Sequence, residues 1–312
     1  MLRFLTRRLG STLFVLFSLT FLTFMVAHLA PGNPVLEMMG NRRDPQRYAE
    51  LMRQYGLDKP ILLQYLDYLG GLLHGDLGMS YKFPGRSVAD ILGHGLPVSL
   101  KLGLGALTLS TLVGVPLGVL AALRRNGLAD RLIMTVMLGL YSIPSFVLIG
   151  LLVWLNVTLY NAHLPALPVA GLEQPAGWVL PIFVLAASSM GYTARLTRSS
   201  LLEVLGQDYM RTARAKGLPM RTVVGVHGMR NALLPLLTVL GPSVAFLVTG
   251  AFVVEKLFNL PGVGYITIQS IGQRDYPVIQ ATTVVLGLAV VVMNLITDLL
   301  YTVFDPRISR ET

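Results

Sequence analysis

The chain has 312 residues, of which 53% are hydrophobic and only 13% are charged, and its formal net charge is +9 at pH 7. This composition excludes an ordinary soluble domain and is typical of an integral membrane protein. The sequence contains no cysteine, which excludes disulfides, thiol catalysis and thiolate metal sites.

Six apolar runs reach or approach the length of about 20 helical residues that crosses a bilayer core of about 30 Å. The sequence therefore predicts an all-α integral membrane protein with six transmembrane helices. In chain order, the predicted spans are Leu9–Ala30, Ser99–Leu123, Leu132–Tyr160, Trp178–Ala194, Asn231–Val254 and Ala281–Val303.

The first apolar run follows Arg3, Arg7 and Arg8, as the core of a signal peptide would. The run is longer than a usual signal core, however, and His28 stands where a cleavage site needs a small residue. We therefore expect this segment to be retained as a membrane anchor, with a cleaved signal as the alternative.

The segment Pro31–Pro97 is the longest stretch between two predicted spans. Its first prolines end the preceding span, because proline fixes φ and lacks an amide donor. Short amphipathic helices are predicted over Arg47–Tyr55 and Pro60–Leu73, the latter with Leu62, Tyr65, Leu66 and Leu69 on one face. A turn is predicted at Gly75–Gly78. The segment is either a solvated cap on the membrane surface or a surface that receives a partner at the mouth of a pore.

The distribution of Lys and Arg predicts the orientation. With the N-terminus in the cytoplasm, the inside segments 1–8, 124–131, 195–230 and 304–312 hold 15 of the 25 Lys and Arg residues. Cytoplasmic loops carry such an excess, so both termini are predicted in the cytoplasm and the long insert outside. Since the basic residues are divided among four short segments, nucleic-acid binding is not expected.

Small residues form a thin face on the second predicted span. Gly114 and Gly118 make a small-xxx-small pattern, which Gly103 and Gly105 extend. Such a face lets helices approach closely, either within the subunit or across a dimer. Prolines in the third, fourth and fifth spans predict kinks, which serve packing alone or a pathway that opens and closes.

Few ionisable residues fall inside the spans. Asp298 is the clearest, and an ion pair with an arginine at the cytoplasmic end is its simplest interpretation. A proton-coupled carrier would place carboxylates or histidines near the midplane. The sequence also lacks the phosphate-binding loop of ATPases, H-E-x-x-H and G-x-S-x-G. These observations favour a passage powered by separate ATPases over a self-sufficient channel or secondary carrier, and over a membrane-embedded enzyme.

The basic segment Asp208–Arg230 lies between two spans and has its own helical pattern. We predict a helix with Asp208 as its N-cap that ends at Gly217 and Pro219. Its packing face is predicted to contain Leu202, Leu205, Tyr209 and Ala213. A structured platform of this kind predicts a docking site for another protein, whereas the simpler interpretation of Gly217 is a C-cap.

The sequence DYMRTARAKG at 208–217, followed by HGMRNA at 227–232, resembles the cytoplasmic coupling loop of ABC importer permeases, in particular their dipeptide/oligopeptide (peptide/nickel) branch. Further motifs of that branch occur in order over nearly the whole chain: Arg7-Arg8, PGNP at 31–34, LDKP at 57–60, GDLG at 75–78, PGVG at 261–264, RDYP at 274–277 and DPR at 305–307. Where the wider family has Glu-Ala-Ala ahead of the glycine, this chain has Arg211-Thr212-Ala213, so no salt bridge of that glutamate is expected.

The resemblance implies the type I ABC importer permease fold, in the first of two permease subunits of the bacterial inner membrane. It implies alternating-access import of di- or oligopeptides, with glutathione or a nickel chelate as alternatives. The implied organisation is a first helix with a periplasmic insert (1–94), a transmembrane domain of helices 2–6 (95–303) with its coupling loop at 195–230, and a cytoplasmic tail (304–312).

The implied partners are a second homologous permease, two cytoplasmic ATPases, a periplasmic substrate-binding protein, the peptide and membrane lipid. ATP and Mg²⁺ would bind the ATPases, and this chain would be no enzyme and hold no cofactor or metal. The implied ATPase-coupling residues are Asp208, Tyr209, Arg211, Thr212, Ala213, Arg214, Ala215, Lys216 and Gly217. A periplasmic gate or receptor contact is predicted at Gly262, Gly264, Arg274, Asp275 and Tyr276, with a turn-rich surface loop as the alternative.

Overall fold

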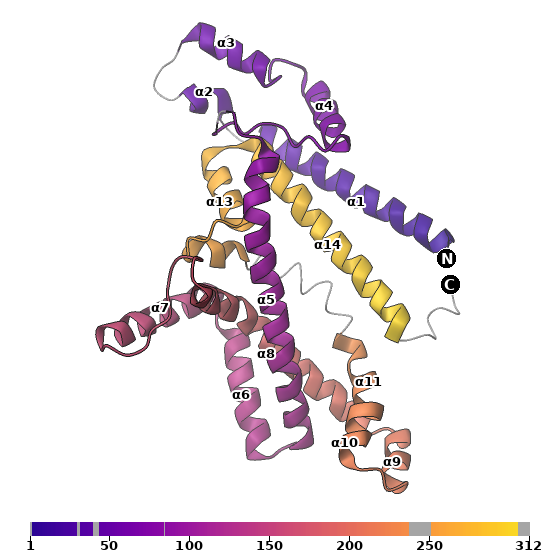
Figure 1. Ribbon diagram of the computed structural model, residues 1–312. Helices are drawn as coiled ribbons and strands as arrows, with labels where there is room; N and C mark the ends of the chain where they lie inside the picture. Colours follow the sequence, from indigo (N-terminus) through magenta and orange to yellow (C-terminus); the bar gives the residue numbers. More distant parts are fainter. Residues whose placement is uncertain (1, 30–31, 40–43, 84, 237–250, 305–312) are drawn as a thin grey trace. The chain divides into compact units, whose positions relative to one another are not determined.

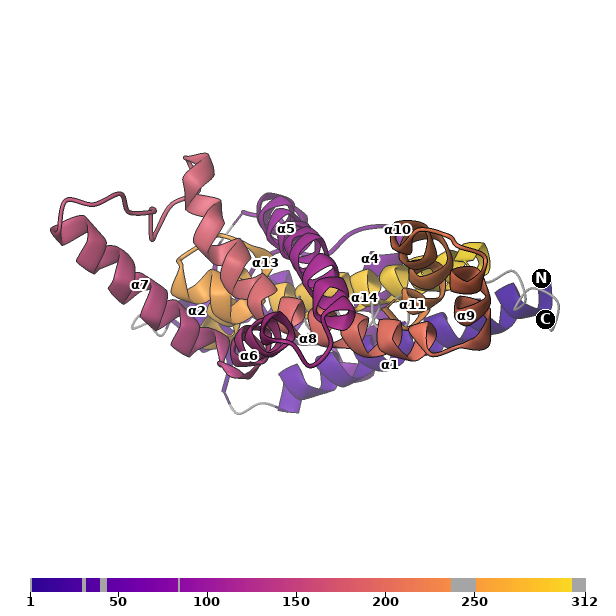
Figure 2. The ribbon, with the colours of Figure 1, turned by 90° about the horizontal axis from the view of Figure 1, so that it is seen from below.

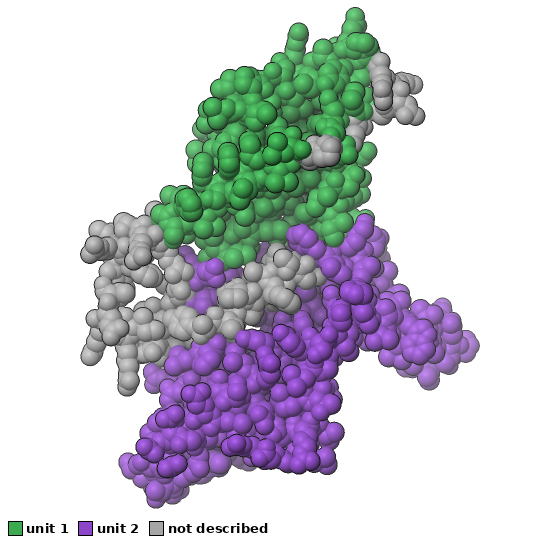
Figure 3. Space-filling view, turned by 180° about the vertical axis from the view of Figure 1, so that it is seen from behind, with its two compact units in different colours: residues 1–98, 261–291 green, residues 99–260, 292–312 purple. Residues whose placement is uncertain are grey.

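The computed structural model describes residues 2–29, 32–39, 44–83, 85–236 and 251–304, and within them the side chains other than those of 2–9, 37 and 298–304. Figure 1 shows these residues as a set of helices joined by loops, of which 74–87 and 162–174 are long. Within the described ranges the chain divides into two compact units, 1–98 with 261–291 and 99–260 with 292–312 (Figure 3). Helices α5 and α14 contribute to both units.

The first unit combines the beginning of the chain with a later hairpin of helices. Its helices are α1 (Leu2–Leu29), α2 (Pro34–Met39), α3 (Pro45–Gln54), α4 (Ile61–Leu73), the start of α5 (Val88–Leu123), α13 (Val263–Gln273) and the start of α14 (Tyr276–Phe304). Its core joins α5 to the hairpin, because Val88 and Leu92 pack with Val263, Val278 and Ala281. These side chains are buried, so the first turns of α5 belong to this core rather than to a loop.

The second unit contains the remaining helices. They are the rest of α5, α6 (Leu128–Ser142), α7 (Ser145–Asn161), η1 (Pro175–Trp178), α8 (Val179–Leu205), α9 (Asp208–Ala215), α10 (Met220–Thr222), the π-helical segment η2 (Val223–Gly228) and α11 (Met229–Ala232). Helix α6 lies beside α8 in both ribbon views (Figures 1 and 2).

Small residues allow α5 to pack closely on α8, as the pattern in the second predicted span indicated. A Cβ atom added at Gly118 would lie 2.5 Å from the Ala194 carbonyl oxygen, and one at Gly114 would lie 3.0 Å from Thr193 Cβ. The close approach at Gly114 and Gly118 therefore occurs within the subunit. Gly103 has open space at its Cβ position and takes no part.

Among the described residues, four helices are long and apolar enough to cross a membrane, and a fifth span results if α6 and α7 count together. The first, second, fourth and sixth predicted spans are all helical. Helix α5 begins at Val88 rather than at Ser99, because its first turns bury apolar side chains and the helix continues through Pro97. The fifth predicted span, Asn231–Val254, lies largely outside the described residues, as does the side chain of Asp298.

The third predicted span is wrong as a single helix. It breaks between Ser142 and Ser145, and α6 and α7 meet at 107°. Pro144 has no amide hydrogen to continue the ladder, and Ile143 takes the extended conformation that a following proline favours (φ −77°, ψ 121°). The predicted kink is therefore a complete break.

The two amphipathic helices of the insert are confirmed as α3 and α4, but the predicted packing face of α4 is wrong. Tyr65 is buried, whereas Leu62 and Leu66 are 67% and 53% exposed. Tyr65 packs against the aromatic rings of α1 and shares a hydrogen bond of 3.1 Å with Thr20 Oγ1. The large aromatic ring, rather than the leucines, therefore attaches α4 to α1.

Candidate functional site

The predicted coupling segment forms a short helix that follows α8 after a tight turn. Helix α8 ends at Leu205, Gln207 is extended (φ −72°, ψ 152°), and α9 then begins at Asp208. Gln207 is therefore the N-cap, and the prediction that Asp208 caps the helix is wrong. Asp208 is the first helical residue, where its negative charge still suits the helix dipole.

One face of α9 is buried against the end of α8 and the segment η2. Met210, Ala213 and Val223 form a buried cluster to which Val204 and Leu205 add partly buried side chains. Met210 and Val223 are fully buried. This cluster fixes α9 to α8, because α9 has too few residues for a helix that is stable by itself.

The predicted packing face is wrong at Tyr209, which is 43% exposed. The prediction assumed that one continuous helix runs from α8 into α9. The turn at Gly206–Gln207 separates the two helices and changes which residues of α9 face α8, so that Met210 is buried instead of Tyr209. The Tyr209 hydroxyl instead accepts a hydrogen bond of 2.7 Å from Asn231 Nδ2.

A second polar contact ties α9 to α8. Arg214 Nη2 donates to the Leu205 carbonyl oxygen at 2.8 Å and so satisfies an acceptor at the end of α8. The helix ends as predicted: Gly217 takes the left-handed conformation (φ +74°) and its amide donates to the Arg214 carbonyl oxygen at 2.9 Å. A Cβ atom at Gly217 would meet nothing within 4 Å.

The opposite face of α9 is open. Of the nine residues predicted to couple to an ATPase, the structure brings all into one turn-and-helix segment, and Ala213 alone among them is buried. The exposed ones include a weak surface ion pair, with Arg211 Nη1 3.5 Å from Asp208 Oδ1. Arg211, Lys216 and Arg214 give this surface, which we name the α9 platform (208–217), a net positive charge.

An ion pair that was not predicted from the sequence joins α6 to α8. Its arginine, Arg198, precedes the α9 platform by ten residues in the sequence. Arg198 Nε lies 2.6 Å from Asp130 Oδ1, and Arg198 Nη2 lies 2.7 Å from Asp130 Oδ2. The Asn126 amide also donates to Asp130 Oδ2, at 2.9 Å, and so fixes the turn between α5 and α6. One signal was available: Asp130 is the only acidic residue in the basic segment 124–131.

The residues predicted as a gate or receptor contact lie at the two ends of α13. Gly262 is the N-cap of α13 and Gly264 lies in its first turn, and both are buried. Arg274 is its C-cap in the left-handed conformation (φ 53°), and Asp275 and Tyr276 lead into α14. The structure thus separates the five residues into two groups.

Asp275 is 1% exposed and anchors part of the insert. Its carboxylate accepts hydrogen bonds from Ser80 Oγ, from the Tyr81 amide at 3.0 Å and from the Lys82 amide at 3.3 Å. Burial, with a smaller contribution from the Asp275 charge, raises the pKa of Tyr81 well above its usual range. Asp275 therefore holds the turn at 80–82, a role that the motif RDYP alone did not indicate. Contact with a receptor stays a prediction.

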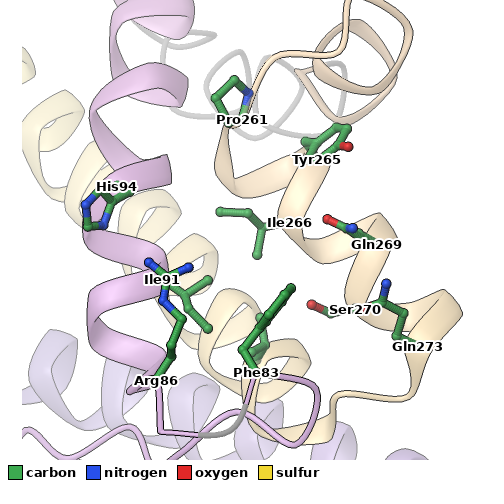
Figure 4. A pocket seen from close by; sticks show the side chains of 11 residues that line it. Phe83, Arg86, Ile91, His94, Pro261, Tyr265, Ile266, Gln269, Ser270 and Gln273 are labelled. Atoms are coloured by element: carbon green, nitrogen blue, oxygen red, sulfur yellow. The ribbon is translucent and has the colours of Figure 1, made fainter.

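A pocket of about 210 Å³ lies between the first turns of α5, helix α13 and the residues that precede α5 (Figure 4). We name it the α13 pocket. Its apolar walls come from Phe83, Ile91, Ile266 and Val278. Its polar lining comes from Arg86, His94, Tyr265, Gln269, Ser270 and Gln273.

No group of three or more His, Asp or Glu side chains suited to a metal ion occurs in the part of the chain that the structure describes. The fold and the α9 platform define a helical membrane protein with an exposed basic surface at the end of one long helix.

Comparisons with known proteins identify the family. Residues 114–310 match the model of the binding-protein-dependent transport system inner membrane component, and residues 1–100 match the model of the N-terminal part of such membrane components. The chain belongs to this family of inner-membrane permeases, which confirms the resemblance to ABC importer permeases and the location in the inner membrane.

Similar proteins span the whole chain. A dipeptide transport system permease protein DppB of Bacillus subtilis is 42% identical over 99% of this chain and 98% of its own length. The di/tripeptide transport system permease protein DppB of Pseudomonas aeruginosa is 40% identical, and the dipeptide permease DppB of Escherichia coli K12 is 38% identical, each over all of both chains.

Proposed function

We propose that this chain is the transmembrane permease subunit of an ATP-driven importer that carries di- and oligopeptides across the bacterial inner membrane by alternating access. The full-length similarity to permeases of dipeptide and di/tripeptide transport systems supports the substrate class. Glutathione or a nickel chelate remains the alternative cargo. The observation that carries the mechanism is the α9 platform, which is firmly packed on one face and open on the other.

The proposed topology has six spans, both termini in the cytoplasm and the insert after α1 in the periplasm. The excess of Lys and Arg in the segments 1–8, 124–131, 195–230 and 304–312 supports it. The chain would then comprise an N-terminal part (1–94), a transmembrane domain (95–303) and a tail (304–312). The α9 platform lies on the cytoplasmic side in this topology.

In the proposed mechanism, two ATPases bind the α9 platform of this permease and that of a second, homologous permease. Closure of the ATPases on ATP and Mg²⁺ moves α9. The buried Met210 cluster and the Arg214 contact transmit the movement to α8, and the Asp130–Arg198 pair carries it to α6. Packed helices respond as rigid elements, so a small displacement at the platform changes the arrangement of the spans.

On the periplasmic side, a substrate-binding protein delivers the peptide near the ends of α13, where Gly262, Gly264, Arg274, Asp275 and Tyr276 form or position the outer gate. The buried Asp275 contacts support a positioning role for this residue. Selection among peptides rests mainly with the binding protein.

The test is uptake of labelled dipeptides by the complete complex in proteoliposomes, with each partner omitted in turn. We expect uptake only with ATP, both permeases, both ATPases and the loaded binding protein. Uptake by this chain alone, driven by an ion gradient, would instead establish the alternative of a secondary carrier.

A further inference from the structure

We infer that the α13 pocket receives the C-terminal residue of the incoming peptide, with Arg86 binding the carboxylate and the apolar walls holding the side chain. The inference rests on the proposed function and assigns a subsite to it. The ligand class is a free α-carboxylate next to an aliphatic or small side chain.

Arg86 lies on one side of the pocket, and polar side chains of α13 lie on the other. In Figure 4, the Arg86 guanidinium lies next to Ile91, facing α13, and the Gln269 amide and Ser270 hydroxyl point from α13 toward the same space. A guanidinium presents paired donors that match the two oxygens of a carboxylate. Amide and hydroxyl groups add further donors to the same anion.

The charge of Arg86 is not balanced locally. Among the residues that the structure describes, no carboxylate forms an ion pair with it. Two acidic residues of the same unit are already engaged: Asp90 accepts from Ser87 Oγ at 2.6 Å, and Asp275 accepts from the 80–82 turn. Arg86 is exposed, so water solvates its guanidinium at the edge of the pocket and it is accessible to a ligand that brings an anion.

The apolar walls and the volume limit what else can enter. Ile91, Ile266 and Val278 contribute aliphatic surface, and Phe83 adds its aromatic ring. The volume of about 210 Å³ is below the range of about 300–1,000 Å³ that is usual for drug-sized ligands, so the pocket fits one peptide residue rather than a whole oligopeptide. The remainder of the peptide would stay outside the pocket.

The pocket is preorganised at its base. A Cβ atom at Gly95 would lie 3.2 Å from the Val263 nitrogen, so the backbones of α5 and α13 approach closely there. Buried Val88, Leu92 and Val263 hold the two helices together. The apolar base therefore needs no rearrangement on binding, whereas the exposed Arg86 side chain becomes ordered when it binds a carboxylate.

The experiment compares Gly-Leu with Gly-leucinamide, which lacks the carboxylate, in proteoliposomes that contain the complete complex and a binding protein saturated with either compound. The variant Arg86→Gln removes the charge and keeps hydrogen-bonding capacity. The matched control Arg53→Gln removes an exposed charge of the same insert that does not line the pocket. Arg86→Lys keeps the charge, and Gln269→Leu tests the pocket from α13 should Arg86→Gln fail to assemble.

We expect Arg86→Gln to lower the acid-to-amide uptake ratio about tenfold or more relative to the unaltered complex, as expected for one charge-assisted hydrogen bond. Arg53→Gln should leave this ratio unchanged, Arg86→Lys should keep most of it, and Gln269→Leu should lower it less than Arg86→Gln. The same binding protein is used with every variant. Its own preference for the acid or the amide therefore cancels when the uptake ratios of two variants are compared.

Two outcomes would overturn the inference. An unchanged ratio in both Arg86→Gln and Gln269→Leu would exclude carboxylate binding in the pocket. An equal loss of uptake for Gly-Leu and Gly-leucinamide would assign the pocket to contact with the binding protein instead. In either case peptide uptake by the unaltered complex would still support the proposed function, whereas absence of any peptide uptake there would refute the function itself.

Discussion

Asp130 and Arg198 join α6 to α8 through a two-pronged ion pair whose N–O distances are 2.6 and 2.7 Å. The Asp130 side chain is 4% exposed and that of Arg198 is 26% exposed. In this geometry the two charge-assisted hydrogen bonds compensate the loss of water around both charges. Removing either partner would leave the other as an unpaired, partly buried charge.

Removal of one partner is therefore expected to destabilise the complex, by on the order of 3 kcal/mol for Asp130→Asn. Arg198→Gln should cost more than Asp130→Asn, because it leaves the 4%-exposed Asp130 carboxylate unpaired, whereas an unpaired Arg198 reaches solvent. The double variant should be more stable than the sum of the single effects predicts. Thermal unfolding of the detergent-solubilised complex measures this coupling. The control is Asp67→Asn in α4, where the side chain is 61% exposed and we expect a change below about 0.5 kcal/mol. Strict additivity of the Asp130 and Arg198 substitutions would show that the pair contributes nothing.

Gly118 and Gly103 provide a matched pair on one helix. Alanine at Gly118 would place a Cβ atom 2.5 Å from a backbone oxygen of α8, which cannot rotate away, so we expect a loss of about 1–3 kcal/mol. Alanine at Gly103 meets nothing within 4 Å and should be neutral or stabilise by up to about 1 kcal/mol through its helix propensity. Similar melting temperatures for both variants would contradict the close packing of α5 on α8.

Met210 attaches the α9 platform to its base. Met210→Ala removes a fully buried side chain from a small cluster and should cost about 2–5 kcal/mol locally. We expect faster hydrogen exchange of the α9 amides and less peptide imported per ATP hydrolysed. Met220→Ala, at a side chain that is 51% exposed, is the control and should change neither quantity. Unaltered exchange in Met210→Ala would mean that the cluster does not hold α9.

Substitutions at Gly217 distinguish a role in capping α9 from a role in docking the ATPase. Asn tolerates the left-handed conformation, so Gly217→Asn should retain the helix end, and its side chain enters space that is empty in this subunit. If the ATPase packs there, as we propose, Gly217→Asn assembles less tightly or imports less per ATP, although α9 exchanges hydrogen at its normal rate. Normal coupling in Gly217→Asn together with a defect in Gly217→Val would assign the residue to capping alone.

Substitution of Asp275 is expected to loosen the turn at 80–82 in the insert. Asp275→Ala removes the acceptor of the Tyr81 and Lys82 amides, and we expect these two amides to exchange hydrogen at least about tenfold faster. The exposed Asp67, which pairs with Lys59 at 2.6 Å on the surface, is the control, and Asp67→Ala should leave the 80–82 turn unchanged. Equal protection in both variants would contradict the anchoring role.

The sequence allowed the helical membrane class, the family and the end of α9 at Gly217 to be predicted, because apolar run length and glycine at a helix end act locally. It did not allow the phase of α9 to be predicted, since a two-residue turn decides whether Tyr209 or Met210 is buried. The contacts of Asp130 with Arg198 and of Asp275 with Ser80 join residues far apart in the chain, and no local pattern specifies them. The α13 pocket was missed for the same reason.

The most direct test of the central claim is disulfide or maleimide crosslinking from single cysteines on the α9 platform. The chain contains no cysteine, so each introduced thiol is unique within it. We predict that Ala215→Cys, which is exposed, crosslinks to an ATPase subunit in the assembled complex, whereas Asn161→Cys at the far end of α7 does not. If Ala215→Cys reacts only with soluble reagent or lipid, while the assembled complex hydrolyses ATP and imports peptide, the α9 platform is not where the ATPases act.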